Sequence, residues 1–382
     1  MEYTIARHYP HQILSEDSDP KVTLYMATHR DPTQNEADRI RFGNLLKDLE
    51  GKLKKTSAPQ QSKMIMQTLT DLKDDRTLWN QRLDGLCVFI NDTQCVVYIL
   101  SNPPRDMAIV GQRFHTKPLL RDFQGLDEYQ ILALSAKEFT LYEGNKSGFR
   151  QMLRKPDEPR TIGDFLGKEF SESYLAQGSY GGVGGSPMFH GHKSKKDEID
   201  KDIERYLKLV DKHVKDHYST ISKKPLILFA LPEYHSFFET RSNNPYLLKH
   251  GIKESPNEVT DTTIKKKAWK IIEPHYEKRI DKLKDQYTKA LQKDRADYNL
   301  NTIAKAAVNG RIDTILIEAF RVIPGRIDTH NGLLIQRNKA QTKFDDALDD
   351  LTDIVLTNGG TVHVIPEENM PSDTGAAAIY RY

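Results

Sequence analysis

The first third of the chain combines short apolar runs with two segments of helical periodicity. Residues 22–26, 85–90 and 95–100 are rich in β-branched and aromatic side chains, and the last two runs flank a polar turn. They predict one strand followed by a hairpin. Residues 36–55 predict a helix whose inner face would be formed by Ile40, Leu45, Leu46, Leu49 and Leu53. A second helix follows, and we expect an α+β domain over residues 1–126.

The central part of the chain has a similar mixture around a glycine-dense segment. Residues 130–134 and 138–142 predict a second hairpin, and residues 225–230 predict a buried strand. Ser194 and Asp197 have the pattern of a capping box at the start of a helix. Apolar residues then recur at helical spacing: Ile199, Ile203, Tyr206, Leu207, Val210 and Val214. We therefore expect an α/β domain over residues 127–258, with this helix packed on its sheet.

The last part of the chain begins after a long helical segment. Residues 259–300 predict a helical connector that is interrupted at Pro274, because proline cannot continue a helix without a break or kink. Strands are then predicted at residues 313–318, 361–365 and 374–382, and a helix at residues 344–356, with its C-cap at 358–360. The fold class is thus α/β and α+β in three domains, the last a C-terminal α/β domain over residues 301–382.

Composition and the lack of long apolar runs indicate in which compartment we expect the protein. Charged residues make up 29% of the chain and hydrophobic residues 37%, which is enough for globular cores. The pattern includes no apolar run of membrane-spanning length and no signal-peptide core at the start, so we expect a cytoplasmic protein. Cys87 and Cys95 both lie in strand-like runs, which favours buried thiols over a disulfide or a metal site.

Charge is distributed unevenly, although the net charge is only +2. Residues 265–295 contain eleven Lys and Arg against five Asp and Glu, whereas residues 345–353 contain five acids and no base. Such segregation permits an anionic partner on the basic side. The alternative is that both runs are solvated helix faces.

A glycine-dense stretch over residues 177–196 is the main candidate for function. Its glycines leave the backbone free to approach a partner closely, and the histidines and lysines at its end, just before the predicted helix, suit contact with a polyanion. The candidate RNA-binding residues of this loop and helix start are Gly181, Gly182, Gly184, Gly185, His190, His192, Lys193, Lys195 and Lys196.

Other chemistries fit this stretch less well. A phosphate-binding P-loop needs four residues between its glycines and a lysine directly after the second, but five residues separate Gly185 from Gly191 and His192 precedes the lysine. His190 and His192 lack a third metal ligand nearby, and Ser186 lies in no nucleophile elbow. The RNP and KH signatures of RNA-binding domains are also missing. We expect no metal, no cofactor and no catalytic residue here.

Several motifs resemble the archaeo-eukaryotic release factor and Pelota superfamily, most closely its bacterial branch. In the first domain these are residues 23–26, 84–89 and 114–119; in the second, residues 141–145 and the glycine loop with its helix; in the third, residues 310–316, 359–362 and 375–382. The resemblance implies a decoding-type domain, a central domain that presents a loop equivalent to the catalytic GGQ loop, and a factor-binding domain similar to kink-turn-binding ribosomal proteins.

The chain departs from the family in the two segments that read the codon and catalyse hydrolysis. Val183 follows the first glycine pair and Ser186 the second, so the glutamine that release factors use for hydrolysis is missing. The codon-reading NIKS segment is not visible in residues 57–63 either. The resemblance therefore implies a Pelota-like factor that lacks both the codon-reading segment and the glutamine needed for hydrolysis.

Taken together, these features predict a ribosome-associated factor that occupies the vacant A site, in hibernation or rescue. Its partners would be rRNA, P-site tRNA and a translational GTPase, with no membrane. Thr28, His29 and Arg30, which follow the first strand, are the decoding-domain candidates. One alternative is a peptidyl-tRNA or nucleic-acid hydrolase that uses His190 or His192 as general base. Another is an RNA-binding module unrelated to translation.

Overall fold

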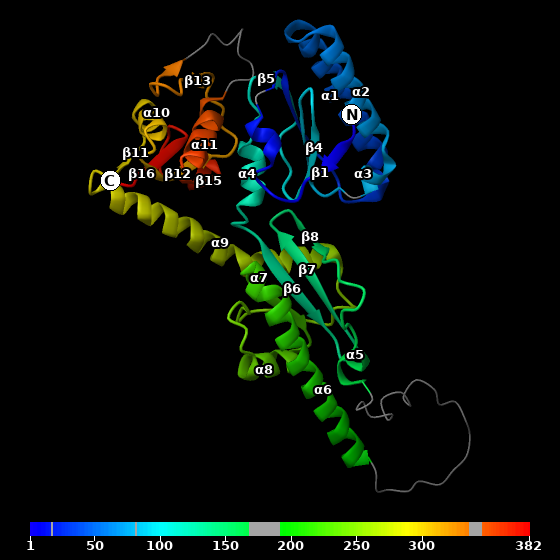
Figure 1. Ribbon diagram of the computed structural model, residues 1–382. Helices are drawn as coiled ribbons and strands as arrows, with labels where there is room; N and C mark the ends of the chain where they lie inside the picture. The colour runs from blue at the N-terminus through cyan, green and yellow to red at the C-terminus, as the bar shows by residue number, and fades with distance from the viewer. Residues whose placement is uncertain (17, 81, 168–191, 336–345) are drawn as a thin grey trace. The chain divides into compact units, whose positions relative to one another are not determined.

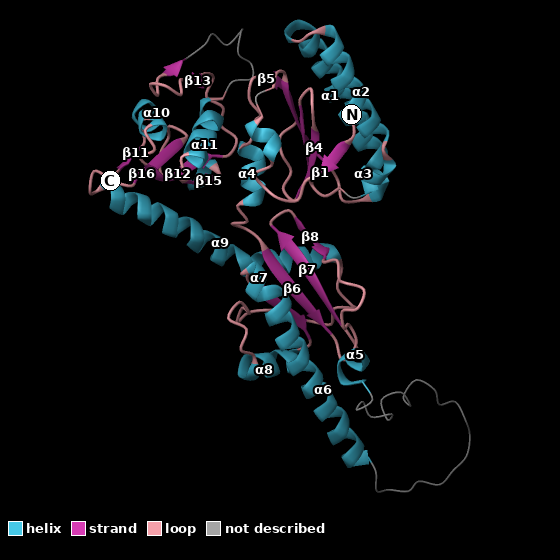
Figure 2. Ribbon diagram, in the orientation of Figure 1, coloured by secondary structure: helices cyan, strands magenta, loops and turns pink. Residues whose placement is uncertain are grey.

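The computed structural model describes residues 1–382 apart from residues 17, 81, 168–191 and 336–345. Contacts within the chain group the residues into two compact units. Unit 1 consists of Met1–Leu126 together with Glu277–Tyr382, and unit 2 is Asp127–Tyr276. Each unit mixes helices with sheets, as Figures 1 and 2 show. The predicted fold class is thereby confirmed, while the predicted domain boundaries stay a prediction.

The first sheet of unit 1 has five strands in the order β1-β4-β3-β2-β5. They are β1 (Tyr3–Ile5), β2 (Lys21–Ala27), β3 (Gly85–Ile90), β4 (Cys95–Leu100) and β5 (Met107–Gly111). All neighbours are antiparallel except β1 and β4, and the predicted hairpin is confirmed as β3 and β4. Helices α1 (Asn35–Thr56), α2 (Pro59–Asp74) and α3 (Arg76–Asn80) pack on one face, and α4 (Lys117–Phe123) packs on the other.

Alternate residues of β2 enter two different cores, as the pleat of a strand requires. Leu24 packs with α1 to α3, and Tyr25 packs on the opposite face. The predicted inner face of α1 was wrong at Ile40, which is 60% exposed, and it omitted Phe42, which is fully buried. Two positions along a helix turn a side chain through about 200°, so these two residues point in nearly opposite directions.

The second sheet of unit 1 has the order β11-β16-β12-β15. Its strands are β11 (Ala296–Asp297), β12 (Ile312–Glu318), β15 (Thr361–Ile365) and β16 (Ala376–Tyr380), with α10 (Leu300–Val308) and α11 (Ala347–Thr357) packed in the same core. A small hairpin, β13 (Arg326–Ile327) with β14 (Leu334–Ile335), lies beside α11. Gly359 has a φ of 72° directly after α11, which confirms the predicted glycine C-cap.

The acidic run of residues 345–353 does not form a solvated helix face. In and next to α11, Asp346, Asp349 and Asp350 are buried, with exposed fractions of 5%, 5% and 8%. Within unit 1 they accept hydrogen bonds from residues 113–117, at the start of α4. The solvated-face alternative is therefore wrong for this run, because each carboxylate has a donor to compensate for the loss of water.

Unit 2 contains a five-stranded sheet in the order β10-β9-β6-β7-β8. Its strands are β6 (Tyr129–Leu134), β7 (Phe139–Asn145), β8 (Gly148–Gln151), β9 (Leu226–Ala230) and β10 (Ile252–Lys253). The predicted second hairpin is confirmed as β6 and β7, and β6 pairs in parallel with β9. One face is covered by α5 (Ile162–Leu166), α6 (His192–Val214) and α8 (Pro232–Arg241), and the other by the first part of α9 (Asp261–Leu291). A short helix, α7 (Thr220–Ser222), leads toward β9.

Helix α9 continues through Pro274 without the predicted interruption. Proline lacks the amide hydrogen that would bond to the carbonyl of Lys270, so the helix loses one internal hydrogen bond there. Apolar residues on both sides of the proline, Ile272 and Ile280, are buried. Their burial offsets the lost bond, which is why one helix persists where the sequence predicts a break.

Two further expectations can be compared with the structure. Cys87 and Cys95 are buried free thiols, as expected from their strand positions. Among the helices of the described residues, none is long and apolar enough to cross a membrane.

Candidate functional site

The predicted RNA-binding residues fall into two groups in the structure. Gly181, Gly182, Gly184, Gly185 and His190 lie outside the described residues. The second group, whose backbone begins helix α6, consists of His192, Lys193, Lys195 and Lys196. The helix thus starts two residues before the predicted cap, Ser194. The first four amides of any α-helix lack partners within the helix, so a helix start is a general place for anions to bind.

Helix α6 is fixed by its apolar face. Tyr206, Leu207, Val210 and Val214 are all buried, and they pack with β6, β7 and β9 in one core. Each fully buried side chain of this size contributes roughly 1.5–3 kcal/mol. The predicted stripe is therefore confirmed, and it secures the helix whose first turns hold the candidate lysines.

A cluster at the far end of α6 was not predicted. The His213 ring nitrogen Nε2 lies 2.8 Å from Glu158 Oε1, and the Tyr218 hydroxyl also donates to that oxygen. Burial opposes ionisation of Glu158, but the hydrogen bonds from Tyr218 and His213 prevail and lower the pKa of its carboxyl. The helix widens into a π-turn at Lys215–Ser219, which brings both donors to the same carboxylate. Glu158 lies in a polar connection without periodicity, so no sequence signal pointed to it.

The decoding-domain candidates lie where β2 ends. The Thr28 hydroxyl donates to the carbonyl of Leu83 at 2.8 Å and is buried. Arg30 is held by Asp84, with Nε 3.0 Å from both carboxylate oxygens and an Nη2 distance of 2.6 Å to Oδ2. Both side chains are therefore held by partners within the protein, and they stabilise the segment that follows β2.

His29 differs from its two neighbours because its side chain is 54% exposed. Its backbone amide donates to Asp38 Oδ2 at 3.0 Å, and its ring Nδ1 lies 2.8 Å from Asp38 Oδ1. Asp38 is buried and also pairs with the buried Arg82 at 2.8 Å. Because a carboxylate accepts the Nδ1 hydrogen, the ring is fixed in orientation and its Nε2 faces outward. Of the three candidates, His29 is thus the one placed to touch a partner.

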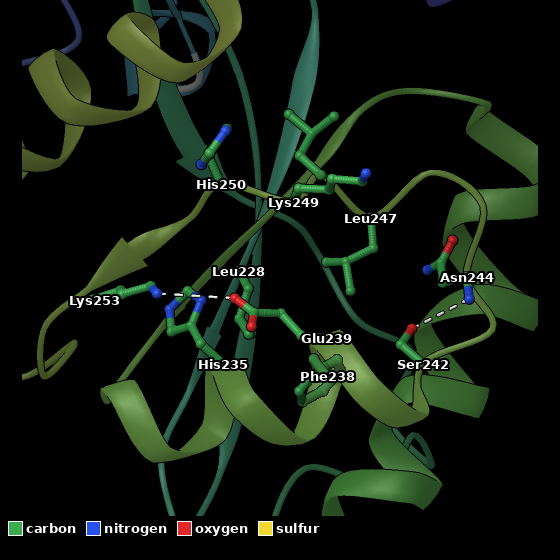
Figure 3. A pocket seen from close by; sticks show the side chains of 11 residues that line it. Leu228, His235, Phe238, Glu239, Ser242, Asn244, Leu247, Lys249, His250 and Lys253 are labelled. Atoms are coloured by element: carbon green, nitrogen blue, oxygen red, sulfur yellow. Dashed lines mark hydrogen bonds and ion pairs between the residues drawn. The ribbon is translucent and has the colours of Figure 1, made fainter.

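Unit 2 also contains a polar cavity of about 560 Å³ between α8 and the segment that leads into β10, drawn in Figure 3. His235 lies at its inner side, and its Nε2 is 3.1 Å from the carbonyl of Ile252. Burial lowers the pKa of the His235 ring, so it is neutral at pH 7 and donates from Nε2. Gly251 is required here, because a Cβ would lie 2.3 Å from the carbonyl oxygen of Leu228.

The cavity suits binding better than acid–base chemistry. Lys253 and Glu239 approach each other to 3.8 Å at its rim, and Lys249 and His250 add exposed basic groups. Ser242 donates its hydroxyl hydrogen to Asp211 at 2.7 Å, which fixes the orientation of this hydroxyl in the lining. Among the described residues there is also no group of three or more His, Cys, Asp or Glu side chains that could hold a metal ion.

The chain is similar to solved structures of a translation termination factor, of a translation termination-like factor and of a Pelota protein. An archaeal translation termination factor, aRF1, is 14% identical over 97% of this chain and 95% of its own, with a TM-score of 0.26. Dom34 of S. cerevisiae is 16% identical over 78% of this chain and 74% of its own, with a TM-score of 0.37. A ribosome-bound archaeal Pelota is 13% identical over 78% and 77%, with a TM-score of 0.39.

The family comparison concerns the part of the chain that carries α6. No curated protein matches the chain. Residues 128–311, however, match the model of bacterial archaeo-eukaryotic release factor family 3. This segment contains all of the predicted loop and helix-start residues as well as the sheet on which α6 packs. The resemblance to the bacterial archaeo-eukaryotic release factors is therefore confirmed over residues 128–311, and this region is release-factor-like.

Proposed function

We propose that the protein is a ribosome-associated translation factor that occupies a vacant A site. The observation that carries the proposal is the release-factor family match of residues 128–311 together with the basic start of α6 inside it. The lysines of that start follow a glycine-dense stretch in the sequence. A helix N-terminus with unpaired amides and adjacent lysines attracts phosphate groups, which rRNA and P-site tRNA supply.

We also propose that the factor acts without hydrolysing peptidyl-tRNA. The glycine pairs are followed by Val183 and Ser186, where a release factor needs glutamine. The factor would therefore protect idle ribosomes in hibernation or mark stalled ribosomes for rescue, with a translational GTPase as a further partner.

The contact with the decoding centre would come from the end of β2. His29 presents an oriented ring edge, whereas Thr28 and Arg30 are held inside the protein. With its hydrogen on Nδ1, the neutral imidazole can accept at Nε2 a hydrogen bond from a base or a ribose hydroxyl. In this proposal the ring of His29 touches rRNA, and its two neighbours maintain its position.

Sedimentation of lysates from growing and starved cells tests the proposal. We expect the protein to move with 70S particles, more so after starvation and less so as salt is raised. The Lys195→Ala/Lys196→Ala variant should lose most of this association. A matched control is Lys208→Ala/Lys212→Ala, which removes the same charge from exposed positions further along α6.

Three outcomes would contradict the proposal. Protein that stays at the top of the gradient under all conditions would exclude stable ribosome binding. Equal loss in both lysine variants would mean that total charge matters and the start of α6 does not. Release of peptide from peptidyl-tRNA by the purified protein would instead favour the hydrolase alternative.

A further inference from the structure

Unit 1 contains a cavity of about 1030 Å³ whose walls come from three stretches of chain. One wall is formed by residues 9–12, Leu14, Ser15 and Lys21, the second by residues 112–114 with Thr116, and the third by Val308, Thr329 and the end of α11. The volume is at the upper end of the range for small-molecule sites in proteins. None of these residues belongs to the family-matched loop or to the candidate site described above.

Lys21 is the most informative residue on these walls. It begins β2, is only 9% exposed, and lines the cavity. Its Nζ lies 5.7 Å from the centre of the Phe114 ring, but no carboxylate of the described residues pairs with it. A buried ammonium without an anionic partner is costly, so a side chain in this position is suited to an anion supplied from outside.

Two further donors face the same space. The Nδ1 of His11 accepts a hydrogen bond from the amide of Ile13 at 3.2 Å, so its Nε2 carries the hydrogen of the neutral ring. The Oε1 of Gln112 accepts from Arg326 at 2.8 Å, which leaves the amide NH₂ of Gln112 as the donor toward the cavity. Together with Lys21 these groups can bind several oxygens of one phosphate.

The other charged groups near this space have partners within the protein. Arg113 lies 3.3 Å from Asp350, and Asp353 accepts a hydrogen bond from the Thr116 hydroxyl at 2.8 Å. Burial raises the pKa of Asp353, so its carboxyl repels an anion less than an ordinary aspartate would. Of the lysine and arginine side chains that line this cavity, Arg113 thus has a carboxylate partner, whereas Lys21 has none among the described residues.

The rest of the lining is apolar or aromatic. Leu14, Phe114, Ile354 and Leu356 provide surface for a flat organic group, and Asn358 offers its side-chain Oδ1 at the rim, since its amide NH₂ donates to the carbonyl of Ala307. A phosphate alone would fill only a small part of the volume. A nucleoside attached to the phosphate would fill the remainder and would use both the aromatic surface and the polar rim.

We propose that this cavity binds a nucleoside mono- or diphosphate, with the phosphate on Lys21 and the base against Phe114 and the end of α11. The site is independent of the proposed ribosome contacts, because it uses none of their residues.

Isothermal titration calorimetry of the full chain tests this proposal with AMP, ADP, GMP and GDP as probes. Inorganic phosphate alone and the nucleosides alone form the comparison arms. We expect one site for at least one nucleotide, bound more tightly than either of its parts. Lys21→Met keeps the buried aliphatic stem and should weaken binding by about tenfold or more, whereas Lys21→Arg should retain part of it. Lys289→Met, at an exposed position of α9, should leave binding unchanged.

A second variant keeps the test valid if Lys21→Met does not fold. Thr357 is exposed at the edge of the cavity, and Thr357→Trp should fill the space and block binding without touching the lysine. Absence of binding by all four nucleotides at millimolar concentration would overturn the proposal. So would binding that both variants leave intact. Phosphate that binds as tightly as the nucleotides would overturn the nucleoside part of the assignment.

Discussion

Two helices of this protein carry runs of like charge and expose them very differently. Lys266, Lys270, Lys278, Lys282 and Lys289 of α9 are all exposed. In and beside α11, by contrast, Asp346, Asp349 and Asp350 are buried. The sequence signal is the same in kind, a local excess of one sign. What differs is whether another segment supplies donors at the right positions.

For α11 the donors come from residues 113–117 of unit 1. Asp349 accepts the backbone amides of Thr116 at 3.0 Å and Lys117 at 2.7 Å, which begin helix α4. Asp346 pairs with the Lys117 ammonium at 2.7 Å. Within the part of the chain that the structure describes, the exposed lysines of α9 have no comparable set of buried acceptors, and their long stems let the charge stay in water. A charged run is therefore buried only when fixed partners compensate for desolvation.

The largest effect is expected from breaking the buried pair. Lys117→Met leaves Asp346 without its cation and should lower the free energy of unfolding of unit 1 by about 3–5 kcal/mol. Denaturant unfolding can be followed by Trp79 fluorescence in a Trp269→Phe background, because the chain has two tryptophans and Trp79 lies in the core of unit 1. Lys282→Met should change stability by less than about 0.5 kcal/mol.

Removing both charges of the Lys117–Asp346 pair separates the effect of charge compensation from that of packing. In Lys117→Met/Asp346→Asn the amide oxygen can still accept from the backbone of Ile323 and Leu348, as the carboxylate does. We expect the double variant to be more stable than Lys117→Met alone. A double variant as unstable as the single one would mean that packing of the lysine stem, not charge compensation, holds the two segments together.

The stability of the folded protein should depend on pH because acidic side chains are buried. Burial, followed by the neighbouring Asp349, raises the pKa of Asp353 from 3.8 to about 7. Between about pH 4 and 7 the folded state therefore retains a proton that the unfolded state has lost, so stability falls as pH rises through this window. Asp353→Asn can still accept from Thr116 and should reduce that fall by about 1 kcal/mol or more. Asp281→Asn, at an exposed acid of α9, should leave the profile unchanged.

A smaller loss of stability is expected at β15, the edge strand of the second sheet of unit 1. The Gln124 side chain accepts the Val364 amide hydrogen at 2.8 Å and donates to the carbonyl of the same residue in strand β15. Gln124→Ala removes both bonds and should cost about 1–2 kcal/mol in the same unfolding experiment. An unchanged unfolding midpoint would show that water replaces both contacts without loss.

The smallest effect on stability is expected on α9. Lys278→Glu/Lys282→Glu should stay within about 0.5 kcal/mol of the parent because both side chains are exposed. If this face contacts RNA, the same variant should sediment less with ribosomes and show a weaker dependence on salt. Unchanged sedimentation would make the basic face of α9 a solvated surface, which was the alternative from the sequence.

Periodicity and turn chemistry in the sequence determined most of the local structure. The β3–β4 and β6–β7 hairpins, the buried stripe of α6 and the glycine after α11 follow from spacing and from backbone preferences, which neighbours within a few residues decide. The release-factor resemblance likewise rests on short motifs that the sequence displays directly, and the family match covers residues 128–311.

Which polar residues are buried and which are exposed depends on the tertiary structure. Asp38 fixes His29 from nine positions away, while Asp84 holds Arg30 and thereby leaves the histidine as the accessible candidate. The burial of Asp349 and the position of the Lys21 ammonium beside Phe114 likewise depend on residues far along the chain. Such outcomes balance desolvation against specific long-range partners, and no local pattern in the sequence encodes that balance.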